Sequence, residues 1–136
     1  MSSDKKILVV EDSEFVRQIY RVAFRKIGGY EVIHANNGAE GLAALAAQPR
    51  FELAIVDINM PVMNGLAFIE QLRRAPRHHD TRVLVATTES ADGKIRDLVA
   101  RSGITYLRKP FSLERLIEAL RALLSLAPMS IPPGTP

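Results

Sequence analysis

The sequence has no cysteine among its 136 residues. Structural disulfides and thiolate metal sites are therefore excluded, and the absence is compatible with the cytosol. Long hydrophobic runs are also missing near the N-terminus, which leads into only four apolar residues at 7–10. This run is too short for the core of a signal peptide or for a membrane span. We therefore expect a soluble, cytoplasmic protein that is not inserted into a membrane.

The chain also lacks a large excess of charge of one sign, since its net charge is +3. A basic balance favours acidic partners in general, nucleic acid included. The basic residues are spread over several predicted helices, however, and no aromatic residues are interleaved with them. This pattern favours a mixed, solvated surface, so we expect no direct contact with nucleic acid. A ladder of Arg17, Arg21 and Arg25 on the first helix is likewise interpreted as a solvated stripe rather than a docking surface.

Short apolar runs alternate with helical patterns five times along the chain. The predicted strands cover residues 7–10, 30–35, 53–56, 83–86 and 104–107. The predicted helices cover residues 14–27, 39–48, 66–74, 91–101 and the segment that follows Ser112. Strands that are apolar throughout and alternate with helices indicate a parallel sheet covered on both faces. We therefore predict a (βα)5 doubly wound α/β fold with one domain at 1–126, and a disordered, proline-rich tail at 127–136.

Polar residues follow four of the predicted strands at the point where each strand ends. Glu11 and Asp12 follow the first strand, and Asp57 follows the third. Thr87 ends the fourth strand, and Lys109 comes shortly after the fifth. Because the carboxyl ends of parallel strands share one edge, where ligands bind, we expect these five side chains to converge.

The three carboxylates define the chemistry expected at this edge. At a separation of ~4 Å and an effective dielectric of ~20, each pair of carboxylates repels by about 4 kcal/mol, so such a cluster takes up protons or holds a cation. Carboxylate oxygens suit Mg²⁺, whereas zinc prefers His and Cys. Asp57 follows the most uniformly apolar strand, which should be central, and a carboxylate there can carry a phosphoryl group as an acyl phosphate.

Lys109 and Thr87 complete the predicted site. The ammonium of Lys109 can offset charge that develops during phosphoryl transfer, and the hydroxyl of Thr87 can donate a hydrogen bond to a phosphoryl oxygen. Other interpretations stay open here, because a lysine in a loop is commonly solvated and threonine is a common strand residue. The Lys109–Pro110 bond has only a small preference for trans, so its isomer is also open.

The segments that carry these residues resemble the receiver domain of bacterial response regulators. The matching segments are 8–13, 56–65, 83–87 and 109–111, and the resemblance covers roughly residues 5–126. In length and layout the chain is similar to single-domain chemotaxis regulators. The resemblance implies a flavodoxin-like sheet with strand order 2-1-3-4-5.

The resemblance also implies a role for each site residue. Asp57 would be the phosphoacceptor, with Thr87 and Lys109 contacting the phosphoryl group. Glu11, Asp12, Asp57 and the backbone carbonyl of Asn59 would hold Mg²⁺. Tyr106 would be the aromatic residue that moves inward on activation.

The resemblance further implies partners in two-component signalling. The donor would be a phosphohistidine on a sensor histidine kinase or phosphotransfer protein. The output surface, formed by residues 91–101, the strand at 104–107 and the final helix, would bind a downstream protein. The chain would be a phosphoacceptor switch rather than a metabolic enzyme, assisting only its own phosphorylation and dephosphorylation. Chemotaxis is one candidate output, and the basic charge and Arg108 leave the target open.

Two alternatives compete with this interpretation. An aspartate-nucleophile phosphatase of the haloacid dehalogenase kind uses similar groups, but it carries Asp-x-Asp after its first strand, where this chain has Glu11-Asp12-Ser13. The other alternative is an interaction module that is never phosphorylated, and the complete set of site residues argues against it. We expect no metal role for His78 and His79, which lie in a predicted loop.

Overall fold

The structure is a computed structural model that describes residues 5–58, 63–88, 97 and 104–125. Its elements are β1 (Lys6–Val10), α1 (Glu14–Ile27), β2 (Glu31–Ala35), α2 (Gly38–Ala47), β3 (Leu53–Val56), α3 (Gly65–Arg74), β4 (Arg82–Thr87), β5 (Thr105–Arg108) and α5 (Leu113–Ser125). The predictions for Asn59 and for the tail at 127–136 fall outside the described residues. The same holds for the predicted helix at 91–101, apart from residue 97.

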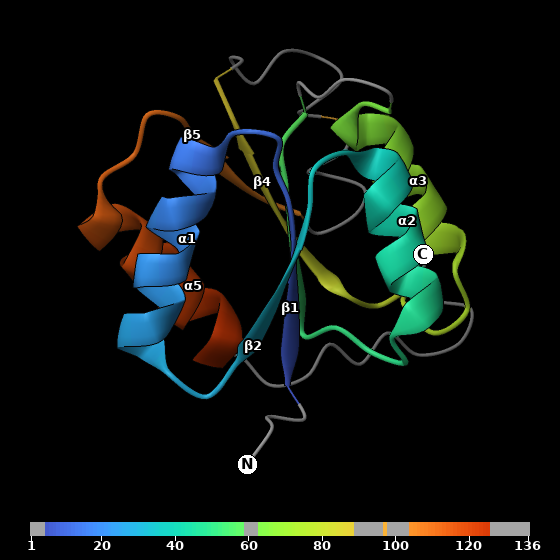
Figure 1. Ribbon diagram of the computed structural model, residues 1–136, viewed down its shortest axis with the longest axis horizontal. Helices are drawn as coiled ribbons and strands as arrows, with labels where there is room; N and C mark the ends of the chain where they lie inside the picture. The colour runs from blue at the N-terminus through green and yellow to red at the C-terminus, as the bar shows by residue number, and fades with distance from the viewer. Residues whose placement is uncertain (1–4, 59–62, 89–96, 98–103, 126–136) are drawn as a thin grey trace.

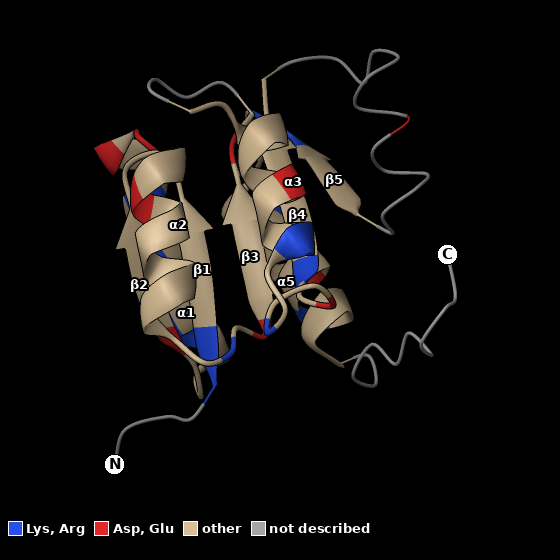
Figure 2. Cartoon of the chain, turned by 90° about the vertical axis from the view of Figure 1, so that its right-hand side faces the viewer, with Lys and Arg blue, Asp and Glu red and all other residues tan. Residues whose placement is uncertain are grey.

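Five parallel strands form one sheet in the order β2-β1-β3-β4-β5. The prediction of a doubly wound α/β fold with this strand order is confirmed. Helices α1 and α5 cover one face of the sheet, and α2 and α3 cover the other (Figure 1). All five strands run in the same direction (Figure 2), so their carboxyl ends lie along one edge, with β3 in the middle.

The helices begin and end where local chemistry predicts. Ser13 caps α1 by accepting a hydrogen bond from the amide of Val16 at 3.3 Å. Gly28 follows the last helical residue with a φ of 74°, which glycine adopts without the steric cost of a Cβ. Helix α2 begins at Gly38, one residue before the predicted start at 39, and Asn37 is its N-cap, accepting a hydrogen bond from the amide of Glu40 at 2.9 Å. A short polar side chain before a helix satisfies the first backbone amides of that helix.

The core has two layers, one on each side of the sheet. In β1, Leu8 and Val10 pack into the layer beneath α2 and α3, whereas Ile7 and Val9 pack into the layer beneath α1 and α5. All four residues are fully buried, as are nearly all residues of β3. Burial on both faces explains why these strands are apolar throughout instead of alternating with period two. Among the described residues, no helix combines the length and apolar character needed to cross a bilayer.

Candidate functional site

Three acidic side chains converge at the carboxyl edge of the sheet. Glu11 and Asp12 directly follow β1, and Asp57 directly follows β3, which is the neighbouring strand. One carboxylate oxygen from each residue lies within 4.8 Å of the other two. Glu11 and Asp57 are buried, at 1% and 7% exposed, whereas Asp12 is exposed to solvent. The cluster therefore opens to solvent on the side of Asp12.

Lys109, which directly follows the edge strand β5, brings a positive charge into this cluster. Its ammonium lies 2.6 Å from Oε1 of Glu11 and 3.3 Å from Oδ2 of Asp57. The backbone amide of Lys109 donates to the carbonyl of Thr87 at 2.9 Å, which fixes the lysine at the end of β4. The peptide bond between Lys109 and Pro110 is cis, so the isomer that the sequence left open is decided by the structure.

The backbone amide of Glu11 and both of its carboxylate oxygens form hydrogen bonds. Its amide donates to the carbonyl of Ala35 in β2 at 2.9 Å. Its Oε2 accepts from the amide of Ser13 at 3.1 Å, while Oε1 accepts from Lys109. Burial raises the pKa of the Glu11 carboxyl, although the hydrogen bond and charge of Lys109 act in the opposite direction.

The remaining predicted residues lie on β4 and β5. Thr87 is the last residue of β4 and is fully buried. Tyr106 lies on β5, half-buried, and packs against the core layer beneath α2 and α3. The two residues occupy the adjacent strands β4 and β5, where Tyr106 is opposite Val85, and Asn59 falls outside the described residues.

The donor set fits a hard divalent cation. All three clustered acidic ligands are carboxylates, which offer the oxygen atoms that Mg²⁺ prefers. Within the described residues, the cluster contains neither the histidine nor the cysteine that a typical zinc site would use. The exposed Asp12 leaves one side open, and Mg²⁺ usually keeps several water ligands. Glu11, Asp12 and Asp57 are therefore suited to hold Mg²⁺.

Gly65 supports the site in a way that sequence reasoning did not assign. Its amide donates to the carbonyl of Ile58 at 3.0 Å, and it is the first residue of α3. A Cβ at this position would overlap with the backbone oxygen of Asp57 and the Cα of Ile58. Only glycine lets α3 begin this close to the loop that carries Asp57. The sequence signal that could have indicated this role of Gly65 is its place in the segment 56–65, which resembles the receiver family.

Arg17 departs from the predicted solvated stripe. Only 12% of its side chain is exposed, because the guanidinium folds back onto the loop after β1. Helical spacing places Arg17, Arg21 and Arg25 on one face of α1. This spacing does not show that the Arg17 side chain reaches the loop after β1.

His78 is the third feature that the sequence did not predict. It is buried, and its Nε2 lies 2.8 Å from the carbonyl of Leu45 and 3.1 Å from that of Gln48. Two acceptors at this nitrogen require it to carry the proton. The histidine therefore satisfies carbonyls at the C-terminal end of α2, which is a structural role.

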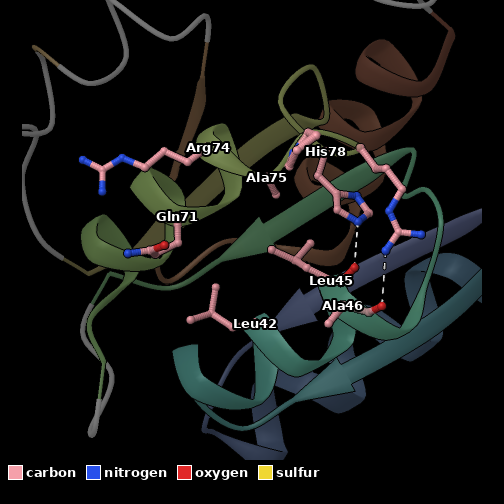
Figure 3. A pocket seen from close by; sticks show the side chains of 9 residues that line it. Leu42, Leu45, Ala46, Gln71, Arg74, Ala75 and His78 are labelled. Atoms are coloured by element: carbon pink, nitrogen blue, oxygen red, sulfur yellow. Dashed lines mark hydrogen bonds between the residues drawn. The ribbon is translucent and has the colours of Figure 1, made fainter.

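A hollow of about 290 Å³ lies between the C-terminal ends of α2 and α3. His78 is one of the residues that line it (Figure 3). These helix ends lead back to the starts of β3 and β4, so the hollow lies at the edge of the sheet opposite the acidic cluster. It therefore takes no part in the candidate site.

The fold and this site define a class of signalling domain. The family model described as the response regulator receiver domain matches residues 7–121. The chain therefore belongs to the response regulator receiver family, and it is a CheY-like receiver domain of two-component signalling.

Similar proteins include chemotaxis regulators and a kinase receiver domain. The Chemotaxis protein CheY homolog of Campylobacter jejuni (strain 81-176) is 30% identical over 119 residues, which cover 88% of this chain and 92% of that protein. The structure of Vibrio cholerae chemotaxis protein CheY4 has a TM-score of 0.77 at 38% identity, covering 88% of this chain and 98% of the other. The receiver domain of sensor histidine kinase PA1611 from Pseudomonas aeruginosa, with magnesium coordinated in its active site cleft, has a TM-score of 0.75 at 22% identity. That match covers 89% of this chain and 98% of the other.

Proposed function

We propose that the chain is a phosphorylation switch in which Asp57 accepts a phosphoryl group from a phosphohistidine in a Mg²⁺-dependent reaction. The donor is a sensor histidine kinase or phosphotransfer protein. The observation that carries this proposal is the convergence of Glu11, Asp12 and Asp57 within 4.8 Å, with the Lys109 ammonium 3.3 Å from Asp57. A purely structural ion pair would not need a third carboxylate, that of Asp12, beside the two that contact the Lys109 ammonium.

Each residue has a separate task in the proposed transfer. An oxygen of the Asp57 carboxylate attacks phosphorus, the P–N bond to the donor imidazole breaks, and the imidazole nitrogen leaves with the electron pair. Lys109 faces the charge on the transferred group, and Thr87 donates a hydroxyl hydrogen bond to one of its oxygens. Mg²⁺, when bound, would supply positive charge against the phosphoryl oxygens. Glu11, Asp12, Asp57 and the carbonyl of Asn59 would hold that ion.

The switch follows from the charge that arrives. A phosphoryl group adds about −1.5 to −2 charge, which draws Lys109 and Thr87 toward it. Tyr106 lies on the strand beside Thr87 and repacks in the altered space. We propose that this changes the face formed by β5 and α5, where a downstream protein binds. Residues 91–101, which the sequence assigns to the same output surface, fall outside the described residues apart from residue 97. A chemotaxis or motility output is one candidate, since similar proteins carry chemotaxis names.

The proposal predicts phosphoacceptor behaviour rather than sustained enzymatic turnover. The test incubates wild-type protein, Asp57→Asn and Asp80→Asn with radiolabelled acetyl phosphate, with Mg²⁺ or with EDTA. Asp80→Asn is the matched control, because it makes the same change outside the acidic cluster. We expect stoichiometric, Mg²⁺-dependent label in the wild type and in Asp80→Asn, and no label in Asp57→Asn.

Three results would contradict the proposal. Unchanged labelling of Asp57→Asn would exclude Asp57 as the acceptor. Release of many equivalents of phosphate per chain from a phosphomonoester such as p-nitrophenyl phosphate would favour the phosphatase instead. A wild-type protein that binds no Mg²⁺ in a calorimetric titration would favour the module that is never phosphorylated.

A further inference from the structure

We propose that Arg17 is a positioning residue for the metal site, fixing the loop that carries Glu11 and Asp12 so that Asp12 faces the cation. The inference rests on the proposed Mg²⁺-dependent function. It starts from the unusual position of the Arg17 guanidinium, which bonds to three different segments at once.

The Arg17 guanidinium uses one nitrogen to join two loops. Its Nη1 donates to the backbone carbonyl of Glu11 at 2.7 Å and to Oδ1 of Asn36 at 2.5 Å. Asn36 directly follows β2, the strand beside β1, and its amide donates to Oε1 of Glu40 in α2 at 2.8 Å. The loop after β1 is therefore tied through Arg17 to the start of α2.

The remaining donors of the guanidinium fix its orientation. Nε and Nη2 of Arg17 both donate to Oε2 of Glu14, at 3.1 Å and 2.5 Å. With the two bonds from Nη1, four of the five N–H groups of the guanidinium are in use. Because the fork is planar and rigid, holding one side of it against Glu14 aims the other side at the Glu11 carbonyl.

These contacts bear directly on Asp12. Its carboxylate is the exposed member of the acidic cluster, so packing does little to hold it in place. The peptide before Asp12 is fixed by Arg17 at the Glu11 carbonyl, and the amide after it, at Ser13, donates to Glu11 Oε2. The direction of Asp12 is therefore set by its two flanking peptides, and Arg17 holds the first of them.

The test compares Mg²⁺ affinity in Arg17→Ala and Arg21→Ala by calorimetric titration at constant ionic strength. Arg21 is the matched control, because it lies one turn further along α1 and pairs with the same Glu14. Removing either arginine deletes one positive charge that pairs with Glu14, but of the two only Arg17 is bonded to the loop after β1. We expect the dissociation constant of Mg²⁺ to rise about tenfold or more in Arg17→Ala, as for other residues that orient metal ligands. In Arg21→Ala we expect it to change less than about twofold.

Two further variants separate orientation from charge and from folding. Arg17→Lys keeps the charge but cannot reproduce the fork, so we expect Mg²⁺ affinity to fall in this variant as well. Asn36→Ala leaves Arg17 in place and removes one of its anchors, and we expect a smaller loss of affinity. This variant also keeps the proposal testable if Arg17→Ala does not fold, which circular dichroism would show.

Two measurements report on positioning itself. In metal-free protein, the amide of Ser13 should exchange with deuterium faster in Arg17→Ala than in Arg21→Ala. In labelling with acetyl phosphate, Arg17→Ala should need more Mg²⁺ for half-maximal rate yet reach the wild-type rate at saturating Mg²⁺.

Equal loss of Mg²⁺ affinity in Arg17→Ala and Arg21→Ala would overturn the inference, as would wild-type affinity in Arg17→Lys, because charge alone would then suffice. A wild-type protein that binds no Mg²⁺ would instead refute the proposed function, so the two failures are distinguishable.

Discussion

The ammonium of Lys109 lies 2.6 Å from Oε1 of Glu11, which is closer than its 3.3 Å distance to Asp57. In this arrangement the lysine neutralises the same carboxylate that Mg²⁺ would use. The metal and the ammonium would therefore compete for Glu11, and arrival of Mg²⁺ would leave Lys109 more available to a phosphoryl group.

Replacing Lys109 by methionine should lower stability without metal and strengthen Mg²⁺ binding. In EDTA, loss of the buried cation leaves Glu11 and Asp57 without their shared partner, so we expect the free energy of unfolding to fall by about 3 kcal/mol. Saturating Mg²⁺ should recover much of this loss through binding to the folded state alone. Urea denaturation with and without Mg²⁺ measures both effects.

Lys26→Met is the control for this prediction, because Lys26 is exposed near the end of α1 and is far along the helix from the cluster. It should change the free energy of unfolding by less than about 0.5 kcal/mol in either condition. Weaker Mg²⁺ binding in Lys109→Met than in the wild type would contradict the proposed competition.

The raised pKa of Glu11 predicts how its contribution to stability depends on pH. Burial is the main cause of the shift, so the folded state binds the Glu11 proton more tightly than the unfolded state does. The resulting stabilisation is fully present below the ordinary pKa of 4.5 and is lost as pH rises through the folded pKa. In EDTA, the stability of the wild type relative to Glu11→Gln should therefore be greater at pH 4.5 than at pH 7.

Glu14 provides a comparison of opposite sign. Hydrogen bonds from Arg17, Arg21 and Gln18 lower the pKa of its carboxyl to about 2. Its stabilisation is present above the ordinary pKa of 4.5 and is lost as pH falls toward 2. The stability of the wild type relative to Glu14→Gln should thus fall toward acid pH. Denaturant titrations across pH measure both profiles, and profiles of the same sign would contradict this account.

Tyr20→Phe should leave the protein as stable as the wild type or more so. The ring is fully buried against Phe111, at 6.0 Å between centroids, and its hydroxyl has no hydrogen-bond partner among the described residues. Burial raises the pKa of this phenol, so it stays neutral. Removing an unpaired buried hydroxyl should raise the free energy of unfolding by about 1 kcal/mol. Tyr30→Phe is the control, and a loss in Tyr20→Phe alone would reveal a partner for the hydroxyl.

Gly65→Ala should weaken the site by moving the backbone of Asp57. The added methyl group would overlap with the Asp57 carbonyl, so either α3 or the loop must shift. We expect Mg²⁺ affinity to fall about tenfold, as for displaced metal ligands. Gly41→Ala is the matched control, because its methyl group would meet the Phe68 ring in the core instead. If both variants lost stability but kept wild-type Mg²⁺ affinity, Gly65 would have no role in placing Asp57.

Most of the fold could be predicted from the sequence. The apolar run at 53–56 coincides with β3, and the run at 7–10 covers β1 apart from its first residue, Lys6, because strand residues buried on both faces are apolar. The N-caps Ser13 and Ser112 could be predicted, because a serine hydroxyl just before a helical pattern can accept a hydrogen bond from one of the first backbone amides of the helix. The fifth strand begins one residue later than predicted, at Thr105, because its edge position leaves its ends weakly defined by hydrophobicity.

The sequence by itself determined which chemical groups stand at the carboxyl ends of the strands, because strand ends are local features that hydrophobic runs mark. Only the tertiary structure decided which side chains contact one another, both at this edge of the sheet and elsewhere. Lys109 pairs more closely with Glu11 than with Asp57, Arg17 folds onto the loop after β1, and His78 is buried against α2. Each of these contacts joins residues of different elements or loops, since Arg17 lies in α1 and reaches the loop that precedes this helix. A long side chain can satisfy its hydrogen bonds in several directions, and only the packed surroundings select one.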